Sequence, residues 1–232
     1  MNAHDFFAEL DRRIAQYDLL CHPFYQAWNE GKLTREDLRE YAAAYFKHVE
    51  AFPEYLDMLR RRLPEGEARL AVTQNMQDEE GIGSTDGRAH HELWLDFAEG
   101  MGADREEVRR RRCQGGVGEA MEYFFGVSDW GAPAEAVAAF YAYESQVPRV
   151  AAAKEKGLKE LYGADKETCA YFTLHKIADV HHSNVWHNLL EQELQGGADP
   201  EAMLQSAEEA AQVLWLALDS IEAERQARMV AA

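Results

Sequence analysis

Three residues in the last third of the sequence have types and spacings that could bind a metal ion. His175, Asp179 and His182 occupy positions i, i+4 and i+7, a spacing that places three side chains on one face of an α-helix. Two imidazoles and a carboxylate are ligands that suit iron, manganese or zinc. Apolar neighbours, among them Phe172 and Val185, indicate that this face is buried. The alternative is an exposed polar face on which histidines gather by chance.

Carboxylates and histidines in other stretches could complete a site for two metal ions. Glu144 ends an aromatic helical stretch, where a lone buried carboxylate costs several kcal/mol unless it is paired or bound to a cation. Glu79 or Glu80 ends another helical stretch, and His90 or His91 begins the next one after a glycine-containing loop. Taken alone, each of these residues could equally lie at the surface of so acidic a protein.

Taken together, these side chains form a set that could support oxidation chemistry. The set contains three carboxylates and three imidazoles: one glutamate near position 79, one histidine at position 90, Glu144, His175, Asp179 and His182. Two divalent cations carry more charge than three carboxylates neutralise, which leaves room for a bridging hydroxide or peroxide. Iron and manganese accept mixed nitrogen and oxygen ligands and change oxidation state. Zinc would also fit these ligands, but it does not change oxidation state. The sequence therefore predicts a dinuclear, oxygen-activating centre.

The ligand set requires helices to position it, and helical signals dominate the sequence. The 232 residues include only six prolines and sixteen glycines, and no stretch shows the alternation of a half-buried strand. Thr34 followed by an acidic turn predicts a helix start, and Pro53 predicts that this helix bends or ends just before it. A long helix is expected from Asp165 to Glu193. We expect one all-α domain over residues 1–232, with roughly eight helices around a shared core.

The overall charge argues against several classes of function. The chain carries 24 Lys and Arg against 42 Asp and Glu, a formal net charge of −18. Binding to nucleic acid or to anionic membranes would require a basic surface, so neither is expected. No apolar run reaches the roughly 18–20 residues of a membrane-spanning helix, and no signal peptide is visible. Three cysteines, odd in number and far apart, do not form a disulfide framework, so a cytoplasmic location is expected.

Several segments carry motifs of one protein family. They are His22-Pro-Phe-Tyr25-Gln-Ala-Trp28, Asn75-Met-Gln-Asp-Glu79-Glu-Gly81, His90-His-Glu-Leu-Trp94, Tyr143-Glu-Ser-Gln-Val-Pro148, Lys154-Glu-Lys-Gly-Leu158 and Tyr171-Phe-Thr-Leu-His175 with Asp179 and His182. With them, most of the chain resembles the CADD-like proteins (Chlamydia protein associating with death domains), which belong to the PqqC/TenA-related, haem-oxygenase-like di-metal oxidases. The resemblance implies a bundle of seven or eight helices that holds Fe/Fe or Fe/Mn, with O2 as co-substrate and a separate electron donor. The ligands that it implies are Glu79, His90, Glu144, His175, Asp179 and His182.

The same resemblance implies a substrate. CADD-like proteins form the p-aminobenzoate moiety of folate by oxygen-dependent cleavage of one of their own tyrosines, with a lysine as nitrogen source. The matching residues here are Tyr25 and Lys154. A tethered phenol beside an oxidising metal pair has a very high effective concentration and needs no substrate pocket. Tyr141 and Tyr171, one helical step from two of the implied ligands, are expected as radical relays or as alternative consumed side chains.

Three alternatives stay open on the sequence alone. The metal centre could oxidise an external small molecule, in the manner of a PqqC-like oxidase. A metal-free hydrolase of the TenA type would rely on Cys169 as its nucleophile, although no acid–base partner stands near it in the sequence. A helical module that binds other proteins would need no metal. For any of these functions, a homodimer is compatible with the sequence.

Overall fold

The computed structural model describes residues 1–82 and 87–231, and eleven α-helices and no strand occur in this part of the chain. In chain order the helices are α1 (Ala3–Ile14), α2 (Pro23–Asn29), α3 (Arg35–Arg62), α4 (Glu67–Glu79), α5 (His90–Gly100), α6 (Arg105–Arg110), α7 (Gly115–Asp129), α8 (Pro133–Glu144), α9 (Val147–Leu161), α10 (Ala170–Gln195) and α11 (Pro200–Ala231). The predicted all-α architecture is confirmed. Short breaks divide it into more helices than the seven or eight expected.

The helix α3 begins where the sequence predicts. The Thr34 hydroxyl accepts a hydrogen bond from the amide of Asp37 (3.1 Å), and the Asp37 carboxylate accepts one from the amide of Thr34 (2.9 Å). This reciprocal cap satisfies two amides that no helical carbonyl can reach. The helix does not end near Pro53 but continues to Arg62, so the expected end there is wrong. Proline removes only one intrahelical hydrogen bond, and buried neighbours such as Phe52 keep the helix packed.

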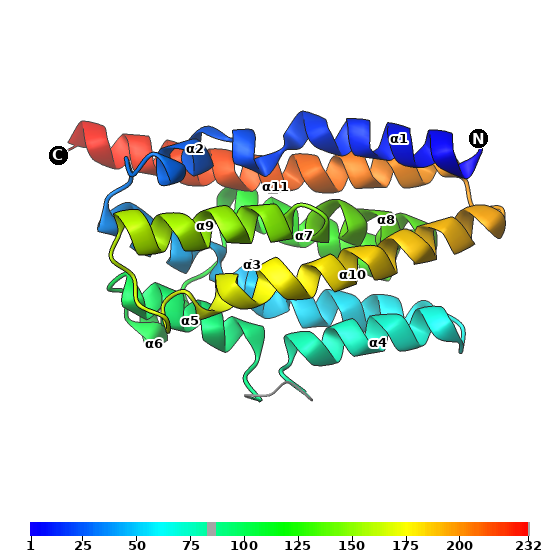
Figure 1. Cartoon of the computed structure of the whole chain (residues 1–232), viewed down its shortest axis with the longest axis horizontal. Coiled ribbons are helices and arrows are strands. Elements are labelled where there is room, and N and C mark those ends of the chain that lie inside the picture. The colour runs from blue at the N-terminus through cyan, green and yellow to red at the C-terminus, as the bar shows by residue number, and fades with distance from the viewer. Residues whose placement is uncertain (83–86, 232) are drawn as a thin grey trace.

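Figure 1 shows how the helices lie side by side. The helices α1 and α11 form one edge of the bundle, and α4 lies at the opposite edge. The helix α11 packs against α7 and α8, α10 packs against α8 and α9, and α3 packs against α4, α5 and α7. In addition, α10 contacts α4 and α5. This arrangement brings four helices, α4, α5, α8 and α9, against α10.

The start of α10 differs from the prediction, and the loop between α4 and α5 lies partly outside the described residues. The helix α10 begins at Ala170 rather than at Asp165. The Asp165 carboxylate accepts hydrogen bonds from the amide (2.9 Å) and the hydroxyl (2.7 Å) of Thr168, so it stabilises a turn that precedes the helix. The glycine-containing loop expected between α4 and α5 lies partly outside the described residues, because 83–86 are not among them.

The buried apolar side chains form one contiguous cluster that includes Trp28 and Trp94. Trp94 Nε1 donates a hydrogen bond to the carbonyl oxygen of Ala42 in α3 (2.8 Å), which satisfies a polar atom in the core. Where α9 passes α2, Gly157 faces the indole of Trp28, and a Cβ added there would lie 2.8 Å from Trp28 Cδ1. The close approach of these two helices therefore requires glycine.

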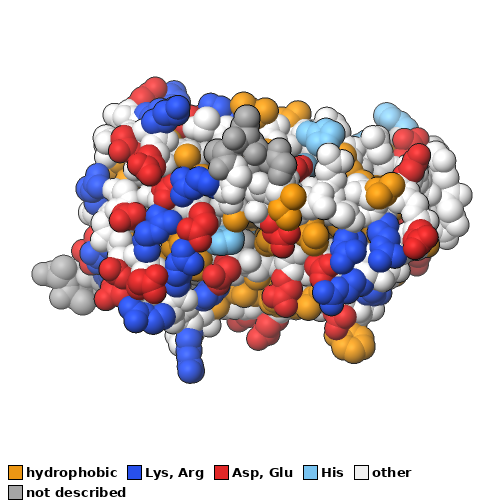
Figure 2. All heavy atoms as spheres, turned by 90° about the horizontal axis from the view of Figure 1, so that it is seen from below, with side chains coloured by type: hydrophobic (Ala, Val, Ile, Leu, Met, Phe, Trp, Pro, Cys, Tyr) orange, Lys and Arg blue, Asp and Glu red, His pale blue; other side chains and the backbone are white. Residues whose placement is uncertain are grey.

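Charged side chains of both signs are interspersed on the face of the molecule shown in Figure 2. Arg105 contacts Asp96 (2.7 Å) and Glu92 (2.9 Å), which ties α5 to the start of α6. Because Asp96 is buried, solvent ions screen its pair with Arg105 less than they would screen an exposed pair. No helix in the described ranges is both long enough and apolar enough to cross a membrane.

The substitution Gly157→Ala is expected to destabilise the fold by about 1–3 kcal/mol, because the added methyl group overlaps the Trp28 ring. Chemical denaturation followed by circular dichroism measures this change. Gly126→Ala in α7 is the matched control, because no atom lies within 4 Å of its added Cβ. The control should be neutral or more stable by about 0.5–1 kcal/mol, as expected for alanine in a helix. Equal stability of the two variants would contradict the proposed contact.

Candidate metal centre

The helix α10 carries three of the predicted ligands on its buried face. His175, Asp179 and His182 are almost completely buried, whereas Ile177 and Val180 between them are exposed. The helix therefore turns polar side chains inward and apolar side chains outward at this point, which reverses the usual pattern of a surface helix. Such an inversion requires a partner for the buried charge.

The other three predicted ligands lie at helix ends that meet α10. Glu79 is the last residue of α4, His90 is the first residue of α5 and Glu144 is the last residue of α8, and all three are buried. Their neighbours in sequence point elsewhere: Glu80 is exposed, and His91 contacts a carboxylate of its own helix (3.4 Å). The C-terminal ends of α4 and α8 add partial negative charge, which favours a cation between them.

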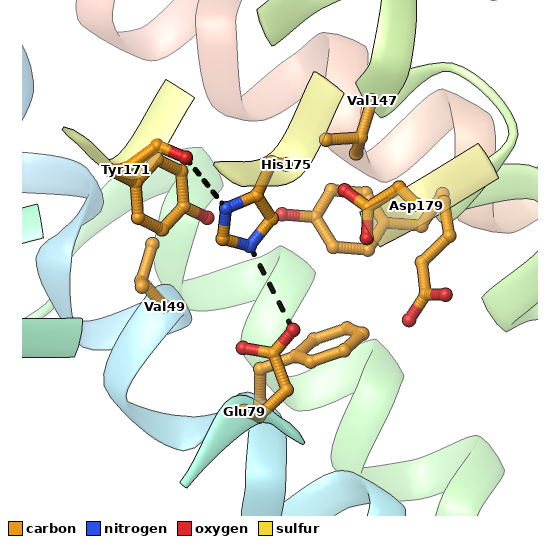
Figure 3. A pocket seen from close by; sticks show the side chains of 9 residues that line it. Val49, Glu79, Val147, Tyr171, His175 and Asp179 are labelled. Atoms are coloured by element: carbon orange, nitrogen blue, oxygen red, sulfur yellow. Dashed lines mark hydrogen bonds and ion pairs between the residues drawn. The ribbon is translucent and has the colours of Figure 1, made fainter. Parts of the chain in front are cut away.

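Glu79, His90 and His175 form a first triad of residues that could hold a metal ion. Glu79 Oε2 lies 2.8 Å from His90 Nδ1, and Glu79 Oε1 lies 3.8 Å from His175 Nε2. Figure 3 shows His175 between Glu79 and Tyr171, and its Nδ1 donates a hydrogen bond to the Tyr171 carbonyl oxygen (2.9 Å). This hydrogen bond selects the tautomer in which Nε2 is free to bind a metal ion.

Glu144, Asp179 and His182 form the second triad. His182 Nδ1 lies 3.2 Å from Asp179 Oδ1 and 3.7 Å from Glu144 Oε2. Trp186 Nε1 donates a hydrogen bond to Glu144 (2.7 Å), and Asn75 Nδ2 donates to both oxygens of the same carboxylate (3.1 and 3.2 Å). These donors orient Glu144 and stabilise its charge.

The pKa values of the buried groups show how strongly they depend on one another. Burial opposes the ionisation of Glu79, but His90 and His175 outweigh it and hold the pKa of this carboxyl well below its usual value. Burial, opposed by His182, raises the pKa of Glu144 to about 8. Burial disfavours the imidazolium form of the histidines, yet the carboxylates raise the pKa of His175 to about 9 and that of His182 to about 10. Without a cation, Glu144, His175 and His182 therefore hold protons at neutral pH, whereas Glu79 is ionised.

The residues of the two triads fit a pair of transition-metal ions. In each triad the ligand atoms lie within 4.8 Å of one another. Asp179 Oδ2 is buried and has no hydrogen-bond partner among the described residues, so a cation would satisfy an otherwise unpaired acceptor. Mixed nitrogen and oxygen ligands suit iron and manganese. The arrangement can therefore hold redox-active metal ions away from bulk water.

A small cavity lies between the two triads and is lined by Glu79, Glu144, His175 and Asp179. A second cavity adjoins it. Tyr143, Val147 and Tyr171 line both cavities, so their side chains form a shared wall. Tyr25 and Lys154 line only the second cavity. The tyrosine expected to react thus lies near the triads but is separated from them by this wall.

Tyr25, Tyr41 and Lys154 form a phenol–amine cluster beside the second cavity. Tyr41 Oη lies 3.0 Å from Tyr25 Oη and 2.5 Å from Lys154 Nζ. All three side chains are buried, and burial lowers the pKa of Lys154 well below its usual value. Tyr41 was not among the residues expected from the sequence. Its i, i+4 spacing with Tyr45 in an alanine-rich helix was the available signal, because it indicates a shared buried face.

The two further tyrosines selected from the sequence occupy different places. The Tyr171 ring stacks on the imidazole of His175, with centroids 3.9 Å apart. Tyr141 does not reach either triad: its hydroxyl donates a hydrogen bond to Asp11 of α1 (3.3 Å). The helix α8 directs Tyr141 toward α1, whereas Tyr143, which was not selected, lines the shared wall. The expected position of Tyr141 is therefore wrong.

The fold defines the class of protein. A protein with a haem-oxygenase-like fold from Shewanella denitrificans matches this structure with a TM-score of 0.81, at 15% identity, over 100% of this chain and 97% of the other. A CADD-like protein from Nostoc punctiforme matches with a TM-score of 0.69, at 17% identity, over 96% of this chain and 97% of the other. These structures share the fold, so the predicted haem-oxygenase-like bundle is confirmed.

Sequence similarity defines the family within this fold. The model of a family described as "Iron-containing redox enzyme" matches residues 39–215. The chain is also similar to a 4-aminobenzoate synthase of Chlamydia pneumoniae, with 36% identity over 91% of this chain and 92% of the relative. The chain belongs to the family of iron-containing redox enzymes and is an oxidoreductase. The predicted resemblance to the CADD-like proteins is confirmed.

The substitution Asp179→Asn is expected to remove metal binding at the second triad without unfolding the chain. The variant preserves the size of the side chain but removes the charge that a cation would neutralise. We expect metal content, measured by plasma mass spectrometry, to fall from about two ions per chain to one or none, with an unchanged helical signal. Glu80→Gln, which alters an exposed carboxylate, is the control and should bind metal as the wild type does. Loss of helicity in Asp179→Asn would instead assign that residue a structural function.

Metal affinity is expected to rise with pH. Because the pKa values of Glu144, His175 and His182 are raised to about 8, 9 and 10, all three groups hold protons near neutral pH, and a metal ion must displace them. Between about pH 6 and pH 8, affinity for Mn(II) or Fe(II) should increase roughly tenfold per pH unit for each proton displaced. Anaerobic competition with a chelator at several pH values measures this slope. A flat profile would show that these groups are already deprotonated.

Proposed function

We propose that this chain forms 4-aminobenzoate by oxidation of its own Tyr25, with Lys154 as the source of nitrogen and O2 as co-substrate. Support comes from the 4-aminobenzoate synthase that is similar over nearly the whole chain. The observation that carries the proposal is the position of Tyr25 and Lys154, which meet in one buried cluster next to the metal centre.

The sizes of the cavities favour an internal substrate. The cavity between the triads has a volume of about 10 Å³, and the adjoining cavity has a volume of about 30 Å³. A cavity needs about 10–15 Å³ to hold one water molecule. Neither cavity is therefore large enough for an external aromatic substrate. A side chain already in the core needs no entry route, and tethering gives it a high effective concentration. Oxidation of an external molecule by the same centre is therefore disfavoured.

The two triads would hold an Fe/Fe or Fe/Mn pair. When bound and supplied with electrons by a separate donor, such a pair activates O2 and oxidises a nearby group. The chain supplies the environment for this chemistry. Trp186 and Asn75 orient Glu144, the Tyr171 carbonyl orients His175, and burial of all six ligands excludes bulk water.

Aromatic rings connect the first triad with Tyr25 across the shared wall. The Tyr171 ring stacks on His175, and its centroid lies 4.8 Å from that of Trp94. The Trp94 centroid lies 5.7 Å from that of Tyr41, whose hydroxyl contacts Tyr25. Neighbouring π systems at these distances allow an electron to move in short steps. We therefore assign Tyr171 and Trp94 to a path by which Tyr25 is oxidised without contacting a metal ion.

The substitution Tyr25→Phe is expected to abolish 4-aminobenzoate formation without changing metal content. The variant keeps the ring in the core but removes the phenolic oxygen. Protein loaded with Fe(II), with and without Mn(II), is exposed to O2 and a reductant, and mass spectrometry measures both the product and the peptide that contains residue 25. The wild-type chain should release at most one product molecule per chain and lose mass at Tyr25.

Tyr141→Phe is the control for this experiment, because it removes a phenol that faces α1 rather than the centre. This variant should give the wild-type yield. Product release that continues in Tyr25→Phe would transfer the assignment to another tyrosine or to an external molecule.

A further inference from the structure

The order of groups in the phenol–amine cluster indicates a function of Lys154 that precedes any transfer of nitrogen. Tyr41 Oη lies between Tyr25 Oη (3.0 Å) and Lys154 Nζ (2.5 Å), so it joins the two by hydrogen bonds. We propose that Lys154 is the base that accepts the phenolic proton of Tyr25, through Tyr41, when Tyr25 is oxidised. The inference rests on the proposed function in that Tyr25 must be the residue that loses an electron.

Oxidation of a buried tyrosine requires a proton acceptor. Loss of one electron turns a phenol into a strong acid, and the cation that would otherwise form is costly in an apolar core. Tyr25 is only 4% exposed, so bulk water does not reach it. Among the described residues, the hydrogen-bond partner of the Tyr25 hydroxyl is Tyr41. The proton of Tyr25 must therefore leave through Tyr41.

The surroundings of Lys154 suit an amine that begins neutral and becomes charged. Its Nζ lies between 4.2 and 5.9 Å from the centroids of five rings: Tyr25, Trp28, Tyr41, Trp94 and Phe172. No carboxylate in the described ranges contacts it, and the adjacent Glu155 instead binds Lys159 and Lys176. Desolvation favours the neutral amine before the reaction, and the faces of the rings stabilise the ammonium afterwards.

The atoms and electrons of the step balance. Tyr25 would give one electron, along the aromatic path, to an oxidised transition-metal ion held by the two triads, and that ion would be reduced by one electron. The O–H bond of Tyr25 breaks and its proton moves to Tyr41, while the original proton of the Tyr41 hydroxyl moves to Lys154 Nζ. The step leaves a neutral phenoxyl radical at Tyr25, an intact phenol at Tyr41 and an ammonium group at Lys154.

This function can be separated from nitrogen donation. A lysine that only donates nitrogen acts after Tyr25 has been oxidised, so its loss would leave an altered residue 25 and no aminated product. A lysine that accepts the proton acts during the oxidation, so its loss would leave Tyr25 intact. The state of residue 25 in a variant without the amine therefore distinguishes the two functions.

The first experiment compares Lys154→Met with Lys156→Met, which alters an exposed lysine of the same helix. Methionine keeps an unbranched apolar chain among the rings, and thermal unfolding verifies the fold. After metal-loaded protein meets O2 and a reductant, mass spectrometry measures the fraction of unmodified residue 25 over time. Lys154→Met should slow the modification by about a hundredfold or more, as for loss of an acid–base group, and Lys156→Met should match the wild type. Modification of residue 25 in Lys154→Met at the wild-type rate would overturn the proposal.

The second experiment uses metal-free protein and does not depend on product formation. A ruthenium photosensitiser oxidises the protein, and electron paramagnetic resonance detects the tyrosyl signal that disappears in Tyr25→Phe. This signal should be strongly reduced in Tyr41→Phe and retained in Tyr45→Phe, which removes a phenol that stacks on Tyr41 outside the hydrogen-bonded chain. An undiminished signal in Tyr41→Phe would overturn the relay.

A nitrogen NMR spectrum of labelled lysines tests the acceptor directly. At about pH 7 the metal-free wild type should show one neutral amine that is missing in Lys154→Met, and a spectrum with only ammonium groups would overturn the proposal. Should the wild-type chain form no 4-aminobenzoate while the radical and the amine behave as described, the proposed function fails and the proton relay is supported.

Discussion

Burial of ionisable side chains in an apolar helical core is the constraint on which the rest of this structure depends. The six residues of the two triads lie where water does not solvate them, so each is stabilised by the others or by a cation. The helix α10 accordingly turns its polar side chains inward. The ends of α4, α5 and α8 must then meet α10 within a few ångströms, and α3 packs along α4 and α5 to hold them there. The helices are thus arranged so that the terminal residues Glu79, His90 and Glu144 meet the buried face of α10.

The shared wall of Tyr143, Val147 and Tyr171 separates the two triads from the phenol–amine cluster. Tyr171 belongs to both sides, because its carbonyl orients a histidine of the first triad while its ring lines the second cavity. The separation keeps the phenol–amine cluster away from the metal ligands, and the aromatic rings keep it electronically close. Protons and electrons would therefore leave Tyr25 in different directions, the proton toward α9 and the electron toward α10.

Much of the fold and half of the ligand set follow from helical periodicity. The i, i+4, i+7 spacing places three ligands on one face of α10 whatever the helix packs against. Periodicity does not decide which of two consecutive residues turns inward at a helix end, so Glu79 and Glu80 were equivalent until α4 was placed against α10. Tyr141 lies one helical step before Glu144 and was therefore expected near the ligands, yet its hydroxyl reaches Asp11 of α1 instead. Tyr41 was missed because its partners lie on other helices, α2 and α9, and only tertiary packing brings them together.

The burial of Tyr25 has a consequence for the life of each molecule. Cleavage of its side chain would remove a large aromatic group from among closely packed neighbours, and loss of a buried aromatic ring costs about 3–5 kcal/mol. Such a loss is a large part of the about 5–15 kcal/mol that keeps a domain folded. A chain that has lost the Tyr25 side chain would therefore unfold more often than an intact chain and become a preferred target of cellular proteases. The amount of product would then follow the rate of protein synthesis, because each newly made polypeptide could react only once.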